Sequence, residues 1–251
     1  MLRWDETTGT VGVFRSPAGY TNGHTVDREG RLVSCSHGAR RVERTEHDGT
    51  ITTVVDRFDG MRLNSPNDVV VASDGAVWFT DPTYGIDSDY EGYAAQGEIG
   101  ASNVYRVDPG SGECAVAADD FVKPNGLAFA PDERRLYVSD TGTTHVLDGP
   151  RHIRVFEVGA DWALSGGEVF ATCDAGIFDG FRFDGEGHLW TSAGDGVHCY
   201  HPDGTLLGKV LVPEGVANVV FGGPRRNRLF ICATTSLYSV MLGVTGAARP
   251  Q

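Results

Sequence analysis

Residues 123–140 read KPNGLAFAPDERRLYVSD, and this stretch contains the unit that decides the fold. A short apolar segment after Asn-Gly leads through a Pro-Asp turn into a second apolar segment, which ends in small or polar residues. The turn and the second segment return at 27–35, 73–81, 184–195 and 223–233. The aligned residues of the five second segments are Leu32, Val77, Leu136, Leu189 and Leu229, at intervals of 45, 59, 53 and 40 residues. Such a period, with three or four short strands in each unit, is typical of the blades of a β-propeller.

Further strands complete each repeat. A third strand follows the second, as at 153–158, and a short apolar strand precedes it, as at 69–72. Residues 1–6 and 11–14 read as the last two strands of one more blade, so we count five full units and a fragment. Because a propeller closes to remove its sheet edges, we expect an all-β, six-bladed β-propeller formed by a single domain, 1–251, that starts late and has an incomplete first blade. Repeated hairpins in a sandwich are the alternative, but they rarely keep so regular a long period.

The composition agrees with many short strands and limits the partners. The 251 residues include 34 glycines, and no stretch approaches the about 18 consecutive apolar residues of a membrane span. Lys and Arg number 21 against 34 Asp and Glu, which gives a net charge of −13. We therefore expect neither nucleic acid nor a membrane surface as a partner, because both need a positive face. The five cysteines form no Cys-x-x-Cys pair and Met1 begins no apolar signal segment, so we expect a cytoplasmic protein.

The residues that open the inner strands predict a metal site. Inner strands line the central channel of a propeller, so their first residues converge on its axis. These residues are Asn22, Asn67, Asn125, Asp179 and Asn218. Amide and carboxylate oxygens are the ligands that hard divalent cations prefer. Each Asn-Gly or Asp-Gly pair alone is also a common turn, but recurrence at one blade position favours a cation site, with Asn67, Asn125 and Asp179 as its best ligands. His24, two residues after Asn22, is a further candidate for lining the channel.

Four long segments carry a family resemblance. They are 65–86 (SPNDVVVASDGAVWFTDPTYGI), 123–142, 179–200 (DGFRFDGEGHLWTSAGDGVHCY) and 217–238. In this order they resemble the six-bladed propellers of the SMP-30/gluconolactonase/luciferin-regenerating-enzyme-like family, and in particular its bacterial gluconolactonase branch. The resemblance covers nearly the whole chain. It implies an enzyme that opens sugar lactones to aldonic acids with the help of a metal ion.

The resemblance also implies roles for individual residues. In the family, one divalent cation (Ca, Mn, Zn or Mg) lies in the central channel. Its ligands are an Asn in a Pro-Asn-Gly turn, an Asp in an Asp-Gly turn and a Glu that opens the first blade. The first two correspond to Asn125 and Asp179, whereas the Glu would lie upstream of Met1. A further Asn, near the cation and facing the substrate, corresponds to Asn67.

Lactone chemistry suits such a site. The carbonyl of a cyclic ester becomes an oxyanion when water attacks, and a divalent cation stabilises the developing charge. We expect Asp179 to be catalytic as well as a metal ligand, because it could take a proton from the attacking water. Asn67 and Tyr84 are the expected substrate contacts. Asp81 and Asp140, which each end a second strand, are interpreted as turn residues or as residues that clamp the blades.

Two other functions stay open at this point. A related propeller hydrolase would act on another ester, such as a larger lactone or an organophosphate. A non-catalytic propeller would bind calcium or a protein. The chain contains neither a Gly-x-Ser-x-Gly motif nor a His-x-x-x-His spacing, so neither a serine esterase nor a zinc cluster is indicated.

Overall fold

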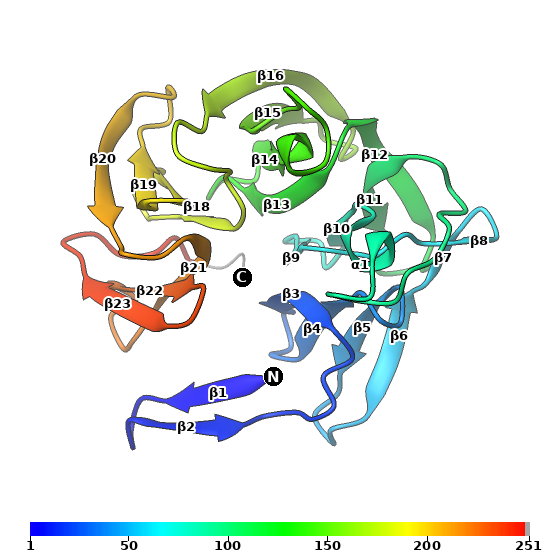
Figure 1. The fold of residues 1–251 in the computed structure, drawn as a ribbon, viewed down its shortest axis with the longest axis horizontal. Helices are drawn as coiled ribbons and strands as arrows, with labels where there is room; N and C mark the ends of the chain where they lie inside the picture. Colours follow the sequence, from blue (N-terminus) through cyan, green and yellow to red (C-terminus); the bar gives the residue numbers. More distant parts are fainter. Residues whose placement is uncertain (249–251) are drawn as a thin grey trace.

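A computed structural model describes residues 1–248 and confirms an all-β propeller. Five antiparallel sheets lie around a central channel, and the first strand of each sheet lies beside the channel (Figure 1). The chain moves outward through each sheet and then returns to the axis to begin the next. No helix within residues 1–248 has the length and apolar character to cross a membrane.

The strands of the five blades follow in chain order. The first blade consists of β3 (Thr21–Val26), β4 (Leu32–Ser36), β5 (Arg41–Thr45) and β6 (Ile51–Val55). The second consists of β9 (Val69–Val71), β10 (Val77–Asp81), β11 (Ser102–Val107) and β12 (Cys114–Phe121). The third consists of β13 (Pro124–Phe129), β14 (Arg135–Asp140), β15 (His152–Val158) and β16 (Leu164–Thr172). The fourth consists of β17 (Phe181–Phe183), β18 (Leu189–Ala193), β19 (Gly196–Tyr200) and β20 (Leu206–Leu211), and the fifth of β21 (Val216–Gly222), β22 (Arg228–Ala233) and β23 (Leu237–Met241).

The prediction of six blades is wrong, because the described residues form five. The fragment expected to belong to a further blade forms a separate two-stranded hairpin, β1 (Leu2–Asp5) with β2 (Thr10–Val13). Its register runs from Leu2 opposite Val13 to Asp5 opposite Thr10. The hairpin lies between the last and the first blade (Figure 1). It lacks inner strands among the described residues and therefore does not make a blade.

A short ribbon and two short helices lie in the connections between strands. A two-stranded ribbon, β7 (Arg57–Phe58) with β8 (Met61–Arg62), joins the first blade to the second. Helix α1 (Tyr84–Asp87) follows β10, and the 3-10 helix η1 (Gly142–Thr144) follows β14. The two short helices thus occupy equivalent places in neighbouring blades, directly after the second strand.

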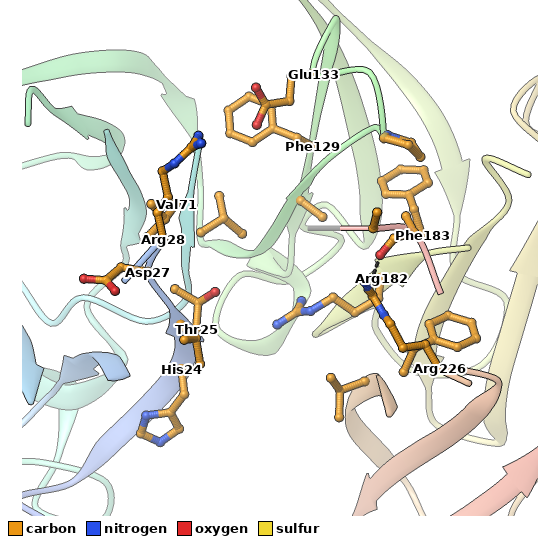
Figure 2. Close-up of a pocket in the computed structure, with 18 of the residues that line it drawn as sticks. His24, Thr25, Asp27, Arg28, Val71, Phe129, Glu133, Arg182, Phe183 and Arg226 are labelled. Atoms are coloured by element: carbon orange, nitrogen blue, oxygen red, sulfur yellow. Dashed lines mark hydrogen bonds between the residues drawn. The ribbon is translucent and has the colours of Figure 1, made fainter. Parts of the chain in front are cut away.

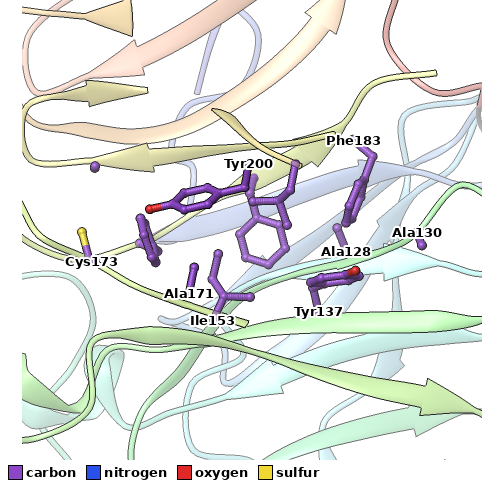
Figure 3. Close-up of a cluster of buried hydrophobic side chains, with 12 residues drawn as sticks. Ala128, Ala130, Tyr137, Ile153, Ala171, Cys173, Phe183 and Tyr200 are labelled. Atoms are coloured by element: carbon purple, nitrogen blue, oxygen red, sulfur yellow. The ribbon is translucent and has the colours of Figure 1, made fainter. Parts of the chain in front are cut away.

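Apolar side chains fill the spaces between neighbouring blades. Between the third and fourth blades, Tyr137 and Phe183 meet edge to face with ring centroids 5.0 Å apart, in a cluster that also includes Ile153 (Figure 3). Between the second and third blades, Trp78 meets Phe129 at 5.4 Å. Burial of each large apolar side chain contributes about 1.5–3 kcal/mol. These clusters therefore hold the blades in a ring and fix their inner strands around the channel.

Candidate metal centre and active site

Short contacts bring the openings of the inner strands together at one end of the channel. Thr80 joins the second and third blades: its carbonyl accepts the Asn67 N–H at 2.8 Å, and its hydroxyl donates to the Asn125 carbonyl at 2.7 Å. Gly126 lies so close to the Asp179 carbonyl that a Cβ at this position would collide with it. The structure thus gathers Asn67, Asn125 and Asp179, the three residues predicted to hold a cation.

Asp81 fixes the loop that carries Asn67. Its carboxylate is buried at the end of β10 and accepts the N–H groups of Asn64 and Ser65, both at 2.8 Å. Burial raises the pKa of Asp81 to about 7, and the two backbone N–H groups oppose this effect. Because Ser65 precedes Asn67 by two residues, the carboxylate sets the position from which the Asn67 side chain enters the site.

Asp140 fixes the segment that carries Asn125 in the next blade, as Asp81 fixes the loop of Asn67. It ends β14 and accepts the N–H groups of Val122 and Lys123, both at 2.9 Å. Asn125 again follows by two residues. Asp81 and Asp140 thus each hold the segment that leads into the inner strand of their own blade, and they place two site residues in equivalent positions of adjacent blades.

The side-chain oxygens of Asn67 and Asn125 have no hydrogen-bond partner among residues 1–248. Both residues are buried, and neither Oδ1 accepts a hydrogen bond from this part of the chain. The Nδ2 of Asn125 faces Thr141 Oγ1 at 3.4 Å. A buried amide oxygen without a donor costs about 1–3 kcal/mol, so two such oxygens at the openings of neighbouring inner strands fit a bound cation that would supply the missing partner.

Asp179 adds a carboxylate to the two amides. The side chain is half-buried, its N–H donates to Ser192 Oγ at 2.9 Å, and its carboxylate accepts no hydrogen bond from residues 1–248. Burial, followed by repulsion from Asp68 and Glu91, raises the pKa of Asp179 to about 7. A positive ion beside the carboxylate would offset both the burial and the repulsion, and it would therefore lower the pKa of Asp179.

The donor set is therefore two neutral amides and one carboxylate. No cluster of three or more His, Cys, Asp or Glu side chains suited to a metal occurs in the part of the chain that the structure describes. A cation at this end of the channel would depend on the amide oxygens of Asn67 and Asn125 together with Asp179. Oxygen ligands of this kind suit calcium, magnesium or manganese.

Asn22 and Asn218 flank these three residues but use their side chains differently. The Asn22 Nδ2 donates to the Asn67 carbonyl at 3.1 Å, so this amide supports the loop of its neighbour. The Asn218 Oδ1 accepts the Val219 N–H at 2.8 Å, which uses the oxygen within β21. Both side chains therefore bind backbone groups around the channel, next to the first residues of the inner strands.

His24 lies away from the three predicted ligands. It stands further along β3 and lines a cavity at the opposite end of the channel, with its Nδ1 2.9 Å from Ser34 Oγ. Burial, with a further contribution from the positive charge of Arg15, lowers the pKa of His24 to about 4. The imidazole is therefore neutral near pH 7 and lies outside the site.

Tyr84 lies close to the centre, at the start of helix α1. Its hydroxyl is 2.6 Å from Thr141 Oγ1 and 3.0 Å from Thr144 Oγ1, so the ring bridges the loops that follow β10 and β14. Burial raises the pKa of Tyr84, and the charge of Asp179 contributes in the same direction. The predicted contact between this residue and a substrate stays a prediction.

Sequence reasoning missed two acidic residues and a lysine near the site. Asp68 is buried beside Asn67 and accepts the Val69 N–H at 2.9 Å. Burial raises the pKa of Asp68, and Arg182 opposes this effect. Lys123, directly before the Pro-Asn-Gly turn, pairs with Asp87 of α1 at 2.6 Å. The one feature of the sequence that could have indicated Lys123 was its position directly before the Pro-Asn-Gly turn.

Comparison with known proteins shows the family. The family described as the SMP-30/Gluconolactonase/LRE-like region matches residues 1–235. The chain belongs to this family. The resemblance predicted from the four long segments is thereby confirmed.

Individual members of the family give the same result. The gluconolactonase of Zymomonas mobilis is 30% identical in an alignment that covers 96% of this chain and 71% of that protein. A solved gluconolactonase from Xanthomonas campestris is 41% identical with a TM-score of 0.89, covering 96% of this chain and 78% of that one. A luciferin-regenerating enzyme has a TM-score of 0.75 at 18% identity and shares the fold.

Proposed function

We propose that this protein hydrolyses sugar lactones to aldonic acids with one divalent cation held by Asn67, Asn125 and Asp179. The observation that carries the proposal is the pair of buried, unpartnered amide oxygens beside a carboxylate whose pKa is raised to about 7. The names of the relatives support the same substrate class, since two of the three compared above are gluconolactonases.

The residues of the chain would divide the chemistry between them. A bound divalent cation polarises an ester carbonyl and stabilises negative charge on its oxygen. The Asn67 and Asn125 amides would hold the cation through their oxygen dipoles without adding charge. Asp179 would take the proton of the attacking water as the water oxygen bonds to the lactone carbonyl carbon. The ring C–O bond then breaks, and the proton passes from Asp179 to the departing alkoxide to give the hydroxy acid.

We further propose that the protein works in the cytoplasm on a small-molecule substrate, without a nucleic acid or membrane partner. All five cysteines are free thiols, and Cys35 and Cys173 are buried, as expected in a reducing compartment. The net charge of −13 disfavours polyanionic partners.

The experiment measures the hydrolysis of glucono-1,5-lactone with a pH indicator. Metal-stripped protein is compared with protein given calcium, manganese, magnesium or zinc. Turnover above the spontaneous rate that depends on added cation supports the proposal. Cation binding without turnover of any sugar lactone would contradict it and favour the non-catalytic propeller, whereas turnover restricted to another ester would favour the related hydrolase.

A further inference from the structure

A cavity of about 690 Å³ lies at the end of the channel opposite the candidate metal centre. The later residues of all five inner strands surround it (Figure 2). Much of its wall is apolar and comes from Phe129, Phe183, Phe221 and Val71. Sites for small organic molecules have volumes of about 300–1,000 Å³ and mainly apolar walls with a few polar groups. The cavity has the size and lining of such a site.

Three guanidinium groups contribute positive charge to this cavity. They belong to Arg28, Arg182 and Arg226, and none forms an ion pair within residues 1–248. Arg226 is tied to the rim by its hydrogen bond to the Ala247 carbonyl. Arg182 extends from β17 into the middle of the cavity (Figure 2). Its one hydrogen bond is from an Nη to the Phe181 carbonyl at 2.6 Å, so its remaining N–H groups have no acceptor among the described residues.

The two carboxylates of the lining do not neutralise these groups. Asp27 points away from the cavity and pairs with Arg31 at 2.8 Å (Figure 2). Glu133 accepts the Ser73 N–H at 2.8 Å and also its hydroxyl. Asp68, whose pKa is raised by burial and lowered in part by Arg182, does not line the cavity and forms no ion pair with Arg182 among the described residues. The side chains that line the cavity therefore combine an apolar wall with an excess of positive charge, and the central charge is that of Arg182.

We propose that this cavity binds a monocarboxylate with an apolar body, whose carboxylate pairs with Arg182 and whose body packs among the phenylalanines. The planar guanidinium matches a carboxylate through two parallel N–H···O bonds. A polyhydroxy acid would lose the hydration of its hydroxyl groups against the apolar wall, and phosphate has no apolar body to cover that wall. The site is separate from the proposed lactone site and does not rest on it.

The test titrates metal-stripped protein with octanoate in the presence of a chelator, by calorimetry. We expect one saturable site, and at least about tenfold weaker binding of octanol, which has the same apolar body without the charge. Arg182→Gln should weaken octanoate binding by about tenfold or more. Val220→Phe, which fills the cavity from β21 and leaves Arg182 in place, should also weaken it.

Two control variants show whether the loss of octanoate affinity arises in the cavity. Arg225→Gln makes the same charge change at an exposed neighbour of the rim that does not line the cavity, and it should leave octanoate affinity unchanged. Asp179→Asn, at the other end of the channel, should also leave it unchanged. Equal binding of octanol, full affinity in both Arg182→Gln and Val220→Phe, or loss of binding in Asp179→Asn would overturn the proposal. Tighter binding of inorganic phosphate or gluconate than of octanoate would overturn the ligand class.

Discussion

Lys123 Nζ donates to Asp87 Oδ2 at 2.6 Å, and this pair joins the loop that carries Asn125 to helix α1. The Lys123 ammonium also bonds the Thr83 hydroxyl and lies 5.0 Å from the centre of the Tyr84 ring. The lysine side chain is only 10% exposed, so the contacts are largely shielded from water. The pair thereby ties the segment that carries the candidate ligand Asn125 to helix α1, in which Tyr84 is the predicted substrate contact.

Lys123→Met should disturb substrate positioning more than the chemical step. Loss of the contacts frees α1, so we expect KM for glucono-1,5-lactone to rise by about three- to tenfold with a smaller change in kcat. The free energy of unfolding should fall by about 1 kcal/mol, because Asp87 is partly exposed. Lys123→Arg, which keeps the charge, should have a KM close to that of the parent protein. Unchanged kinetic constants in Lys123→Met would contradict this positioning role.

Asn125→Ala should weaken cation binding, because it removes one of the two unpartnered amide oxygens. We expect about a tenfold or larger rise in the Kd for calcium or manganese, measured by calorimetry. Asn218→Ala is the matched control, since its oxygen is already bonded to the Val219 N–H. An equal loss of affinity in both variants would argue that the effect is one of general packing.

Asp179 should make the stability of the metal-free protein depend on pH. Its pKa is about 7 in the folded protein against an ordinary 3.8, so the folded state holds a proton that the unfolded chain releases. The stability gained in this way is complete below about pH 4 and is lost as the pH rises through about 7. Asp179→Asn lacks this loss, so its Tm relative to the parent protein should increase from about pH 4 to about pH 7.5. A Tm difference that does not change with pH would contradict the shifted pKa.

Gly126→Ala should separate the inner strands of the third and fourth blades. A Cβ at position 126 would collide with the Asp179 carbonyl, whereas one at Gly208, in β20, would meet nothing within 4 Å. We expect Gly126→Ala to lower the free energy of unfolding by about 2–3 kcal/mol, and Gly208→Ala to change it by less than about 0.5 kcal/mol. Chemical denaturation measures both, and equal stabilities would show that the strands adjust without cost.

The sequence predicted those parts of the fold that repeat. The second strands around Val77 and Leu136 recur with their turns, and each inner strand opens near an Asn or Asp, so blades and ring could be inferred from the repeat. The Lys123–Asp87 pair could not, because it joins helix α1 of one blade to a residue 36 positions further along the chain, in the next blade, and the period gives no information on side-chain contacts between blades. His24 was a candidate for lining the channel, but the sequence did not indicate at which end it lies, since two residues of strand carry it towards the end opposite Asn22. The number of blades was overestimated because the pairing of β1 with β2 was read as part of a larger sheet.

The most direct test of the central claim compares the parent protein with Asp179→Asn in one cation-dependent lactonase assay. Both proteins are stripped of metal, checked for the same fold by circular dichroism, and titrated with calcium or manganese during hydrolysis of glucono-1,5-lactone. The account predicts that added cation restores turnover in the parent protein and leaves Asp179→Asn at the spontaneous rate. Equal cation-restored turnover in the two proteins would contradict it.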